Sequence, residues 1–554
     1  MTGSKLTDQL TLMAAHFGPE TAFVDLGGSG TSGVAGSGTS VLAGSRALSF
    51  ADWDGQANGV ARGLIRIGVE RGDRVAIDVS AEHPLAWVVA YAAIHKAGAV
   101  SVPINTRWVA PEVRAVYEHA EVSVVVADEP TLERVGESLS GSGRTGDGPA
   151  APGVRAVVAV EVAERPFARP LLAWDDVIDD DRSAPPLDLD DDELADIVYT
   201  SGTTGRPKGV AVRHANSSLL PVGVPTWSGA GWLSCSPLFT FAGMTSIYNP
   251  MKLGMTALYL PHFEPVAWIA AVERYRPAMV FLVPAMAELL LAHPDFERAD
   301  LSSIGLCALG SAPLAAAVQR RLQARMPAAS VSNAYGMTEA GPAFTILPKE
   351  ETVRRAGSVG RPLPPAEFFV VDPAGERLGA GETGELVIQL PGRPREYYHD
   401  HEATAQVWRG DGLHTGDLAR IDEDGYVYVV GRAKEVIIRG GNNVYAVDVE
   451  AVLYEHPDVV EAVVAGVAHP VLGEDVAAWV VARSGSSLEP TDLREWAAER
   501  LADYKVPRRI VFVPSLPRNA TGKVVKSELV SPDPTSLGNP VLGDPVLGDP
   551  AEST

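Results

Sequence analysis

A loop of hydroxyls, glycines and one lysine follows an apolar run near residue 200. Residues 199–210 read Tyr-Thr-Ser-Gly-Thr-Thr-Gly-Arg-Pro-Lys-Gly-Val. Glycines without a Cβ let backbone N–H groups approach an anion, the hydroxyls add donors, and the lysine adds a positive charge. The spacing differs from that of the common P-loop, and a surface turn without a ligand is the alternative. We predict a phosphate-binding loop made of Thr200, Ser201, Gly202, Thr203, Thr204, Gly205 and Lys208.

Four later segments of the sequence form one ordered set of motifs with this loop. They are Tyr335-Gly336-Met337-Thr338-Glu339, Thr415-Gly416-Asp417, residues 431–434 (Gly-Arg-Ala-Lys) with Gly440-Gly441-Asn442, and residues 517–523 (Pro-Arg-Asn-Ala-Thr-Gly-Lys). In this order they resemble the motifs of the adenylate-forming superfamily, which contains acyl-CoA synthetases, luciferases and the adenylation domains of peptide synthetases. The similarity covers nearly the whole chain, and the chain most resembles the acyl-CoA synthetases, which are AMP-forming carboxylate–CoA ligases.

The resemblance implies a reaction in two halves. A carboxylic acid attacks the α-phosphate of ATP, which gives an acyl-adenylate and pyrophosphate, and the acyl group then passes to the thiol of CoA. Because two anions must meet, catalysis depends on positioning and on positive charge at the transferring phosphoryl group. The implied cofactors are ATP, Mg²⁺ and CoA. A carrier protein, an amine or another small nucleophile is the alternative acceptor, and a non-catalytic nucleotide-binding protein is the alternative of a different class.

The same resemblance assigns the phosphate end of the site. The loop at 201–208 would hold the β- and γ-phosphates, and Thr338 would contact the α-phosphate. Lys523 would bridge the carboxylate and the α-phosphate oxygens, a role that suits a point charge on a long stem. Glu339 and Thr204 would hold Mg²⁺. The expected catalytic residues are Lys523, Thr338, Glu339 and Lys208.

The resemblance also assigns the nucleoside end and a hinge. Tyr335 would stack on adenine, Asp417 would accept hydrogen bonds from the ribose hydroxyls, and Arg432 would bind the ribose. Outside this set, a Tyr-Gly pair indicates core plus turn, and Thr-Gly-Asp is a common turn. Lys434 would be the hinge about which a lid rotates, exchanging the Lys523 loop for another strand. The further expected binding residues are Gly310, Ser311, Ala312, Gly336, Gly440 and Gly441.

The acid is less well specified than the nucleotide. Thr240 stands where acyl-CoA synthetases often have histidine, which either alters gating and acid specificity or is neutral. Nearby there is no aspartate like the one that holds an amino group in peptide synthetases, so an α-amino acid is disfavoured. Candidate lining residues fit an aryl, alicyclic or fatty acid, but also an ordinary core. They are Trp227, Phe239, Phe241, Met244, Tyr248 and Met337.

The composition limits the binding partners and the cellular compartment that we expect. The net charge of −24 argues against nucleic acid or an anionic membrane as a partner. Two cysteines cannot form a disulfide framework, and no long apolar stretch of the signal-peptide kind begins the chain. We therefore expect a cytoplasmic setting. A carrier protein as partner and a homodimer as assembly are left open.

Short apolar runs alternate with helical patterns over much of the chain. Runs such as 75–77 and 156–160, interleaved with helical segments such as 314–326, predict α/β layers with buried parallel strands. Residues 85–94 predict a buried helix. Closely spaced short strands in residues 365–431 predict a β-rich subdomain.

The domains follow from these patterns and from the resemblance. In this α/β fold class, residues 1–433 would form a large N-terminal domain of layered α/β subdomains plus the β-rich subdomain. Residues 434–530 would form a small, mobile α+β lid, and residues 531–554 a disordered low-complexity tail. Two Gly- and Ser-rich segments, 27–45 and 136–153, predict flexible surface insertions.

Overall fold

The chain forms two units in the computed structural model. The first comprises Met1–Glu435 with Arg518–Lys523, and the second comprises Val436–Pro517 with Val524–Thr554. The predicted tail and most of both predicted insertions lie outside the part of the chain that the structure describes. The described residues are 5–27, 45–140, 153–161, 166–200, 207–218, 220–341, 345–519 and 523–529.

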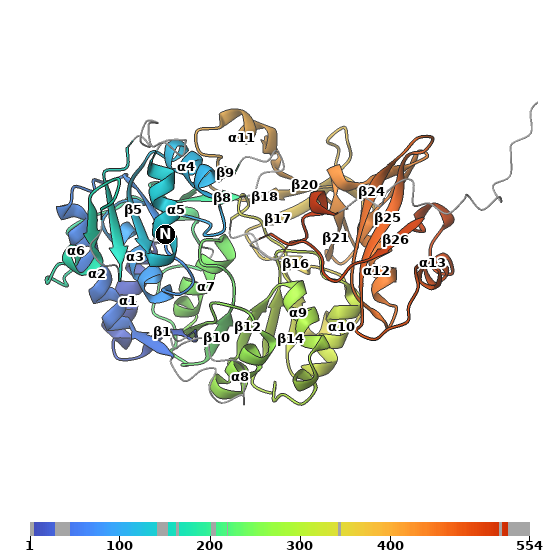
Figure 1. Cartoon of the computed structure of the whole chain (residues 1–554), viewed down its shortest axis with the longest axis horizontal. Coiled ribbons are helices and arrows are strands. Elements are labelled where there is room, and N and C mark those ends of the chain that lie inside the picture. Colours follow the sequence, from blue (N-terminus) through green and yellow to red (C-terminus); the bar gives the residue numbers. More distant parts are fainter. Residues whose placement is uncertain are drawn as a thin grey trace, which may run out of the picture. The chain divides into compact units, whose positions relative to one another are not determined.

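One sheet of the first unit carries the stem of the predicted phosphate loop (Figure 1). Its strands are parallel except for the last, which runs antiparallel to its neighbour. In the described residues the order is β7 (Leu171–Ala173), β6 (Ala156–Val160), β5 (Val122–Asp128), β3 (Arg74–Asp78), β4 (Val100–Pro103), β8 (Leu194–Thr200) and β9 (Lys208–Arg213).

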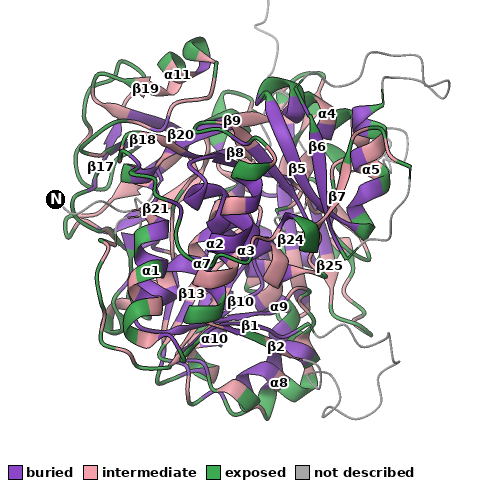
Figure 2. Cartoon of the chain, turned by 90° about the vertical axis from the view of Figure 1, so that its left-hand side faces the viewer, coloured by how far each residue is buried: buried purple, intermediate pink, exposed green. Residues whose placement is uncertain are grey.

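Helices cover both faces of this sheet because its strands are apolar on both sides. Along β5, Val124 and Val126 belong to one buried cluster, whereas Val125 and Ala127 belong to another. Alternate residues of a strand point to opposite faces, so neither face is left to solvent, and Figure 2 shows these strands as buried. The first cluster includes helices α2 (Phe50–Arg66) and α3 (Pro84–Lys96), and the second includes α4 (Ala110–His119) and α5 (Glu129–Leu139).

Helix α5 extends into a segment predicted to be flexible. The insertion was expected from residue 136, but the helix ends only at Leu139. Val135 and Leu139 are fully buried against the sheet, and their spacing of four residues places them on one helix face. The prediction was wrong at this edge because the glycine and serine content obscured that apolar pair.

A second sheet of the first unit positions the predicted nucleoside residues. Its neighbouring strands are parallel, apart from the antiparallel edge pair β1–β2. In the described residues the order is β14 (Ser330–Asn333), β13 (Leu306–Leu309), β12 (Met279–Leu282), β10 (Gly231–Ser234), β11 (Thr256–Tyr259), β1 (Thr21–Asp25) and β2 (Arg46–Ser49). The accompanying helices are α1 (Leu6–Phe17), α7 (Phe241–Lys252), α8 (Pro265–Tyr275), α9 (Pro284–Ala292) and α10 (Ala316–Arg325), whereas the short α6 (Trp174–Val177) contacts β6 and β7 of the first sheet.

The predicted β-rich subdomain is confirmed as an antiparallel sheet. It contains β17 (Glu367–Val371), β18 (Thr383–Gln389), β20 (Gly412–Ile421) and β19 (Trp408–Arg409), and β21 (Val427–Arg432) pairs with β20. A separate short pair is formed by β15 (Thr345–Ile346) and β16 (Arg361–Pro362). Helix α11 (His401–Val407) precedes β19. Asp417 and Arg432 lie on the paired strands β20 and β21 of this antiparallel sheet.

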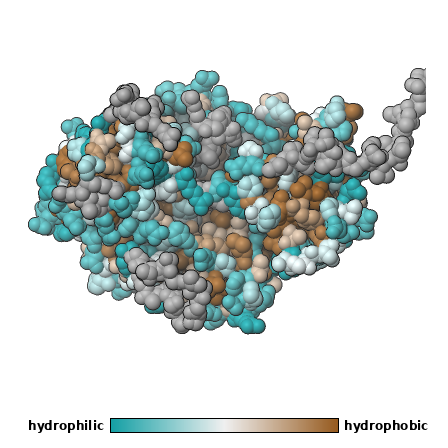
Figure 3. Space-filling view, in the orientation of Figure 1, coloured by the Kyte–Doolittle hydropathy of each residue, from teal (hydrophilic) through white to brown (hydrophobic). Residues whose placement is uncertain are grey.

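The second unit is a small α+β fold. Its sheet contains β23 (Asn442–Val444), β22 (Ile437–Arg439), β25 (Gly473–Ala482) and β24 (Val459–His469), with β26 (Arg509–Phe512) parallel to β25. Helices α12 (Ala446–Tyr454) and α13 (Pro490–Ala498) bury Val449, Leu453 and Leu493 in its main core. Figure 3 shows further hydrophobic side chains over this sheet, where Val463 and Trp479 belong to a smaller cluster.

The fold class predicted from the sequence, a large α/β domain with a small α+β domain, is confirmed. The buried helix predicted at 85–94 is also confirmed as α3, which is longer by a few residues at its ends. Within the described ranges, the longest apolar helices fall short of the length and hydropathy that a membrane span requires.

Candidate active site

The predicted adenine-binding segments follow two neighbouring parallel strands. Residues 310–312 come directly after β13, and Tyr335 comes two residues after β14. The carboxyl ends of parallel strands meet at one sheet edge, where open α/β sheets bind ligands. Gly310 packs closely there, since a Cβ would lie 3.3 Å from the carbonyl oxygen of Ala334. Ser311 has a φ of 69°, a left-handed conformation that non-glycine residues adopt rarely.

Asp417 is a buried carboxylate at the centre of a polar cluster. It pairs with Arg432 across β20 and β21, and its Oδ1 lies 2.6 Å from Nε of that arginine. Its Oδ2 accepts a hydrogen bond from the phenol of Tyr335. Burial raises the pKa of the Asp417 carboxyl, although the arginine and the phenol oppose this. Burial, followed by the Asp417 charge, raises the pKa of Tyr335 far above its ordinary value, so the phenol stays a donor.

The structure brings the expected ribose and adenine residues together. Tyr335 lies at the edge of the second sheet, and Asp417 and Arg432 come from the β-rich sheet about 80 residues later. The phenol of Tyr335 is held by Asp417, and its ring meets Phe368 edge-on with centroids 6.2 Å apart. A carboxylate, a guanidinium and an aromatic ring thus form one group with hydrogen-bonding capacity for a ribose.

Two residues that the sequence did not single out contact Thr338 and Glu339. Nη1 of Arg395 donates to the carbonyl oxygen of Thr338 at 2.9 Å. The phenol of Tyr397 donates to Oε1 of Glu339, also at 2.9 Å. Burial, followed by the Glu339 charge, raises the pKa of Tyr397, which keeps the phenol protonated. The aromatic pair at 397–398 was the only signal in the sequence, and it resembles ordinary core residues.

Lys208 begins β9 directly after the predicted phosphate loop. It pairs with Thr200 of β8, and its Nζ lies 4.8 Å from the ring centroid of Tyr397, within the range of a cation–π contact. Gly209 is needed for packing, because a Cβ would lie 2.8 Å from Cγ2 of Ile197. The remaining predicted loop residues, Ser201, Gly202, Thr203, Thr204 and Gly205, lie outside the described residues.

Lys523 groups with the first unit. Residues Arg518–Lys523 are assigned to that unit, and the backbone of Lys523 is held by Asn519, whose Oδ1 accepts from its N–H at 3.0 Å. The side chain keeps exposed surface. Desolvation, followed by the charge of Arg432, lowers the pKa of its ammonium, while the charges of Asp417 and Glu339 act in the opposite direction. Its charge is therefore within electrostatic reach of both ends of the candidate site.

The predicted hinge and lid residues have distinct local structures. Lys434 lies in the short helix η4 (Ala433–Glu435), which ends the first unit's main segment. Gly440 and Gly441 have φ values of 55° and 85° and form the turn between β22 and β23 of the second unit. The turn requires glycine because both residues are left-handed.

The expected acid-binding residues divide into two groups. Trp227 stacks on Phe17 at 5.7 Å, and Met244 and Tyr248 are buried in a core cluster of the first unit. Phe239, Phe241 and Met337 are only partly buried. Thr240, in the place of the common histidine, caps helix α7: its Oγ1 accepts from the Gly243 N–H and donates to the Pro237 carbonyl. This threonine therefore has a structural role at the start of helix α7.

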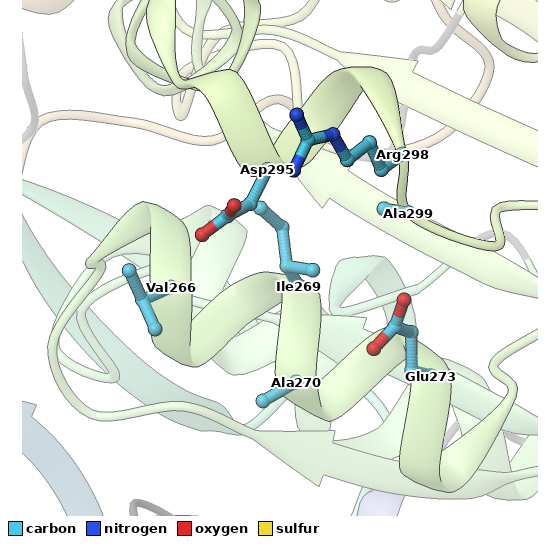
Figure 4. Close-up of a pocket in the computed structure, with 7 residues that line it drawn as sticks. All are labelled: Val266, Ile269, Ala270, Glu273, Asp295, Arg298 and Ala299. Atoms are coloured by element: carbon cyan, nitrogen blue, oxygen red, sulfur yellow. The ribbon is translucent and has the colours of Figure 1, made fainter. Parts of the chain in front are cut away.

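A surface hollow of about 260 Å³ lies elsewhere in the first unit (Figure 4). It is formed by one face of α8 and by the segment around the short helix η2 (Pro294–Glu297). Its lining contains none of the candidate site residues. The lining residues are Val266, Ile269, Ala270, Glu273, Asp295, Arg298 and Ala299.

The donor set near Glu339 suits a metal that is bound mainly through a substrate. The described residues contain no group of three or more His, Cys, Asp or Glu side chains arranged to hold a metal ion. Mg²⁺ usually takes one or two carboxylates together with phosphates and waters. A single carboxylate, oriented by the Tyr397 phenol, fits that requirement and does not fit a metal held by protein ligands alone.

Comparisons with known proteins agree with this geometry. The family model for AMP-binding enzymes matches residues 29–398, and the model for their C-terminal domain matches residues 448–523. A feruloyl-CoA synthase from an Amycolatopsis species is 35% identical over 488 residues, which cover 87% of this chain and 93% of that protein.

Solved structures of related enzymes are also similar to this chain. ATP-bound MatB from Rhodopseudomonas palustris matches with a TM-score of 0.78 and 28% identity, covering 95% of this chain and 98% of MatB. The amide bond synthetase McbA from Marinactinospora thermotolerans matches with a TM-score of 0.77 and 28% identity, covering 94% and 98%. With the Asp417 cluster, Glu339 and Lys523 in one unit, these matches identify the chain as a member of the AMP-binding enzyme family.

Proposed function

We propose that this chain is an AMP-forming carboxylic acid–CoA ligase. The observation that carries the proposal is the group of Tyr335, Asp417 and Arg432, in the same unit as Lys523. An anionic carboxylate attacking an anionic phosphate needs such a cation at the point of attack. The relatives named as acid–CoA ligases support the same reaction.

In the first half-reaction the acid's carboxylate oxygen bonds to the α-phosphorus of ATP, and the bond from that phosphorus to the pyrophosphate oxygen breaks. Asp417 accepts hydrogen bonds from the ribose hydroxyls, which fixes the nucleoside. Lys208 pairs with the leaving pyrophosphate, and Lys523 neutralises charge between the carboxylate and the α-phosphate. Mg²⁺, held by Glu339 and Thr204, would neutralise the triphosphate.

In the second half-reaction the thiol sulfur of CoA bonds to the acyl carbon and gives up its proton to solvent, and AMP leaves with the electron pair of the broken acyl–oxygen bond. We propose that rotation about Lys434 removes Lys523 and brings the turn at Gly440 and Gly441 to the site. The predicted domain limits, 1–433 and 434–530, belong to this proposal.

The acid and the compartment are also proposals. Because a feruloyl-CoA synthase is 35% identical, we propose an aryl acid as the first substrate class to test, ahead of alicyclic and fatty acids. The buried free thiols of Cys235 and Cys307 suit a reducing cytoplasm. A carrier-protein partner and a homodimer stay predictions.

A panel of carboxylic acids tests the reaction and the acceptor together. Acid-dependent ATP–pyrophosphate exchange is expected with at least one acid, and added CoA should give a thioester by mass spectrometry. No exchange with any acid would favour a non-catalytic nucleotide-binding protein. AMP release with amide in place of thioester, on adding amines, would favour the acceptor chemistry named for McbA.

A further inference from the structure

Residues 396–398 pair with the outer edge of β9, and together with Arg395 they are here called the edge segment. The N–H of Ala211 donates to the Glu396 carbonyl at 2.9 Å, and the N–H of Tyr398 donates to the Gly209 carbonyl at 2.7 Å. Tyr397 and Val210 form the antiparallel bridge between them. The edge segment is thus fixed to the strand that begins with Lys208.

Helix α11 holds the edge segment from the other side. The side chain of Asp400 caps this helix by accepting from the Ala403 N–H at 2.9 Å. Oγ1 of Thr404, in the first turn, accepts from the N–H of Tyr397 at 2.9 Å. The same hydroxyl donates to the Asp400 carbonyl. The backbone at Tyr397 is therefore held on both sides, which fixes the direction of its side chain.

From this position Tyr397 contacts two predicted catalytic groups. Its hydroxyl donates to the Glu339 carboxylate at 2.9 Å, and its ring lies 4.8 Å from the Lys208 ammonium. The hydroxyl can orient one carboxylate oxygen and leave the other available. The ring favours a nearby cation without neutralising it, as a carboxylate would.

Arg395 reinforces the arrangement two residues earlier. Its side chain is 3% exposed, and it donates to the carbonyl oxygens of Thr338 and Asn216. Its guanidinium lies 4.5 Å from the ring centroid of Phe241. Gly341 leaves room for it, because a Cβ there would lie 2.7 Å from Cζ of Arg395. The guanidinium therefore fixes the backbone that carries Glu339.

We propose that the edge segment positions the two sides of the triphosphate site relative to each other, with Tyr397 as the positioning residue that joins Glu339 to Lys208. This inference rests on the proposed function, since it gives these two side chains a common ligand. The phenol touches no substrate in this role and acts through Glu339.

Replacing Tyr397 by phenylalanine separates the two contacts. Phe keeps the ring beside Lys208 and removes the donor to Glu339, whereas Tyr397→Leu removes both. Equilibrium binding of a non-hydrolysable ATP analogue, with and without Mg²⁺, reports on each contact without turnover. For Tyr397→Phe we expect Mg²⁺ to tighten binding about tenfold less than in the wild type, as for the loss of one hydrogen bond to a charged group. Binding without Mg²⁺ should be unchanged. Tyr397→Leu should weaken both.

A double-mutant cycle tests whether the phenol acts through Glu339. Tyr397→Phe in a Glu339→Gln background should have much less effect on Mg²⁺-dependent binding than it has alone. Equal effects in the two backgrounds would overturn the proposal, because a general structural role adds independently. Tyr398→Phe is the matched control, since that ring stacks on His399, and it should bind like the wild type.

The failure of this inference is distinguishable from failure of the proposed function. Absence of pyrophosphate exchange in the wild type would overturn the function. An active wild type whose Mg²⁺-dependent binding is matched by Tyr397→Phe would overturn only the inference. If Tyr397→Phe unfolds, Thr404→Ser and Thr404→Val replace it: serine should behave as the wild type, and valine should reduce the Mg²⁺ effect by loosening the backbone at Tyr397. Equal behaviour of these two variants would also overturn the inference.

Discussion

Asp417→Asn tests the nucleoside end of the site with a change of almost no volume. The carboxylate has two acceptor oxygens, which serve the Tyr335 phenol and Nε of Arg432. An asparagine has one acceptor oxygen, so its amide group must face one of the two donors. The Asp417 side chain is 8% exposed, whereas that of Arg432 is 42% exposed.

The magnitude follows from these exposures. The half-exposed arginine limits the ion pair to about 0.5 kcal/mol. Changing the buried phenol's acceptor from a charged to a neutral group costs about 1.5 kcal/mol. These two losses together are about 2 kcal/mol, but the neutral amide also avoids the burial cost that raises the pKa of the Asp417 carboxyl, so we expect the free energy of unfolding to fall by less than about 2 kcal/mol. With ATP bound, the ribose also loses one charged acceptor, so the affinity for ATP should fall about tenfold or more.

Two measurements check this prediction. Denaturant titration gives the change in unfolding free energy, and calorimetry gives the dissociation constant of an ATP analogue. Asp372→Asn is the matched control, because Asp372 caps an exposed turn by accepting from the N–H groups of Ala374 and Glu376; its ATP affinity should equal that of the wild type. Unchanged ATP affinity in Asp417→Asn would refute the assignment of this cluster to the ribose.

Two further predictions concern stability. Gly341→Ala places a Cβ 2.7 Å from Arg395 at a φ of 66°, so the free energy of unfolding should fall by about 2–4 kcal/mol. Gly375→Ala is the control, because its φ is 89° but the space around it is open; there the fall should be about 1 kcal/mol. Equal losses in denaturant titrations would refute the packing argument. Burial, followed by His95, lowers the pKa of His214 from 6.5 to about 4. The folded state holds this imidazole neutral, so the stability of the protein is full above pH 6.5. As the pH falls toward 4, the free energy of unfolding should decrease by about 3 kcal/mol. His214→Gln should flatten stability over that range, and an unchanged profile would argue against a buried neutral imidazole.

Much of the fold could be predicted because it depends on local pattern. The apolar runs that become β3, β5 and β6 are short and β-branched, and buried parallel strands need such runs. The end of α5 could not be predicted, because only the sheet shows that Leu139 has a partner. The local composition does not indicate that contact.

The site could be predicted only where chemistry and sequence motif coincide. Glu339 and Asp417 lie in short motifs, so their residue types and order indicated a nucleotide site. Tyr397 reaches that site because it pairs with Val210 of β9, and Arg395 stands two residues before it. No local sequence pattern predicts such a distant contact. The sequence allowed two interpretations of Thr240, altered gating and specificity or a neutral change. The structure adds that its side chain caps α7.

In the proposed reaction Lys523 supplies the positive charge for adenylation. The most direct test measures ATP–pyrophosphate exchange by Lys523→Ala with an acid that the wild type activates, together with binding of the ATP analogue. Exchange should fall by about a hundredfold or more while the analogue still binds. Near-normal exchange in this variant would contradict that role of Lys523.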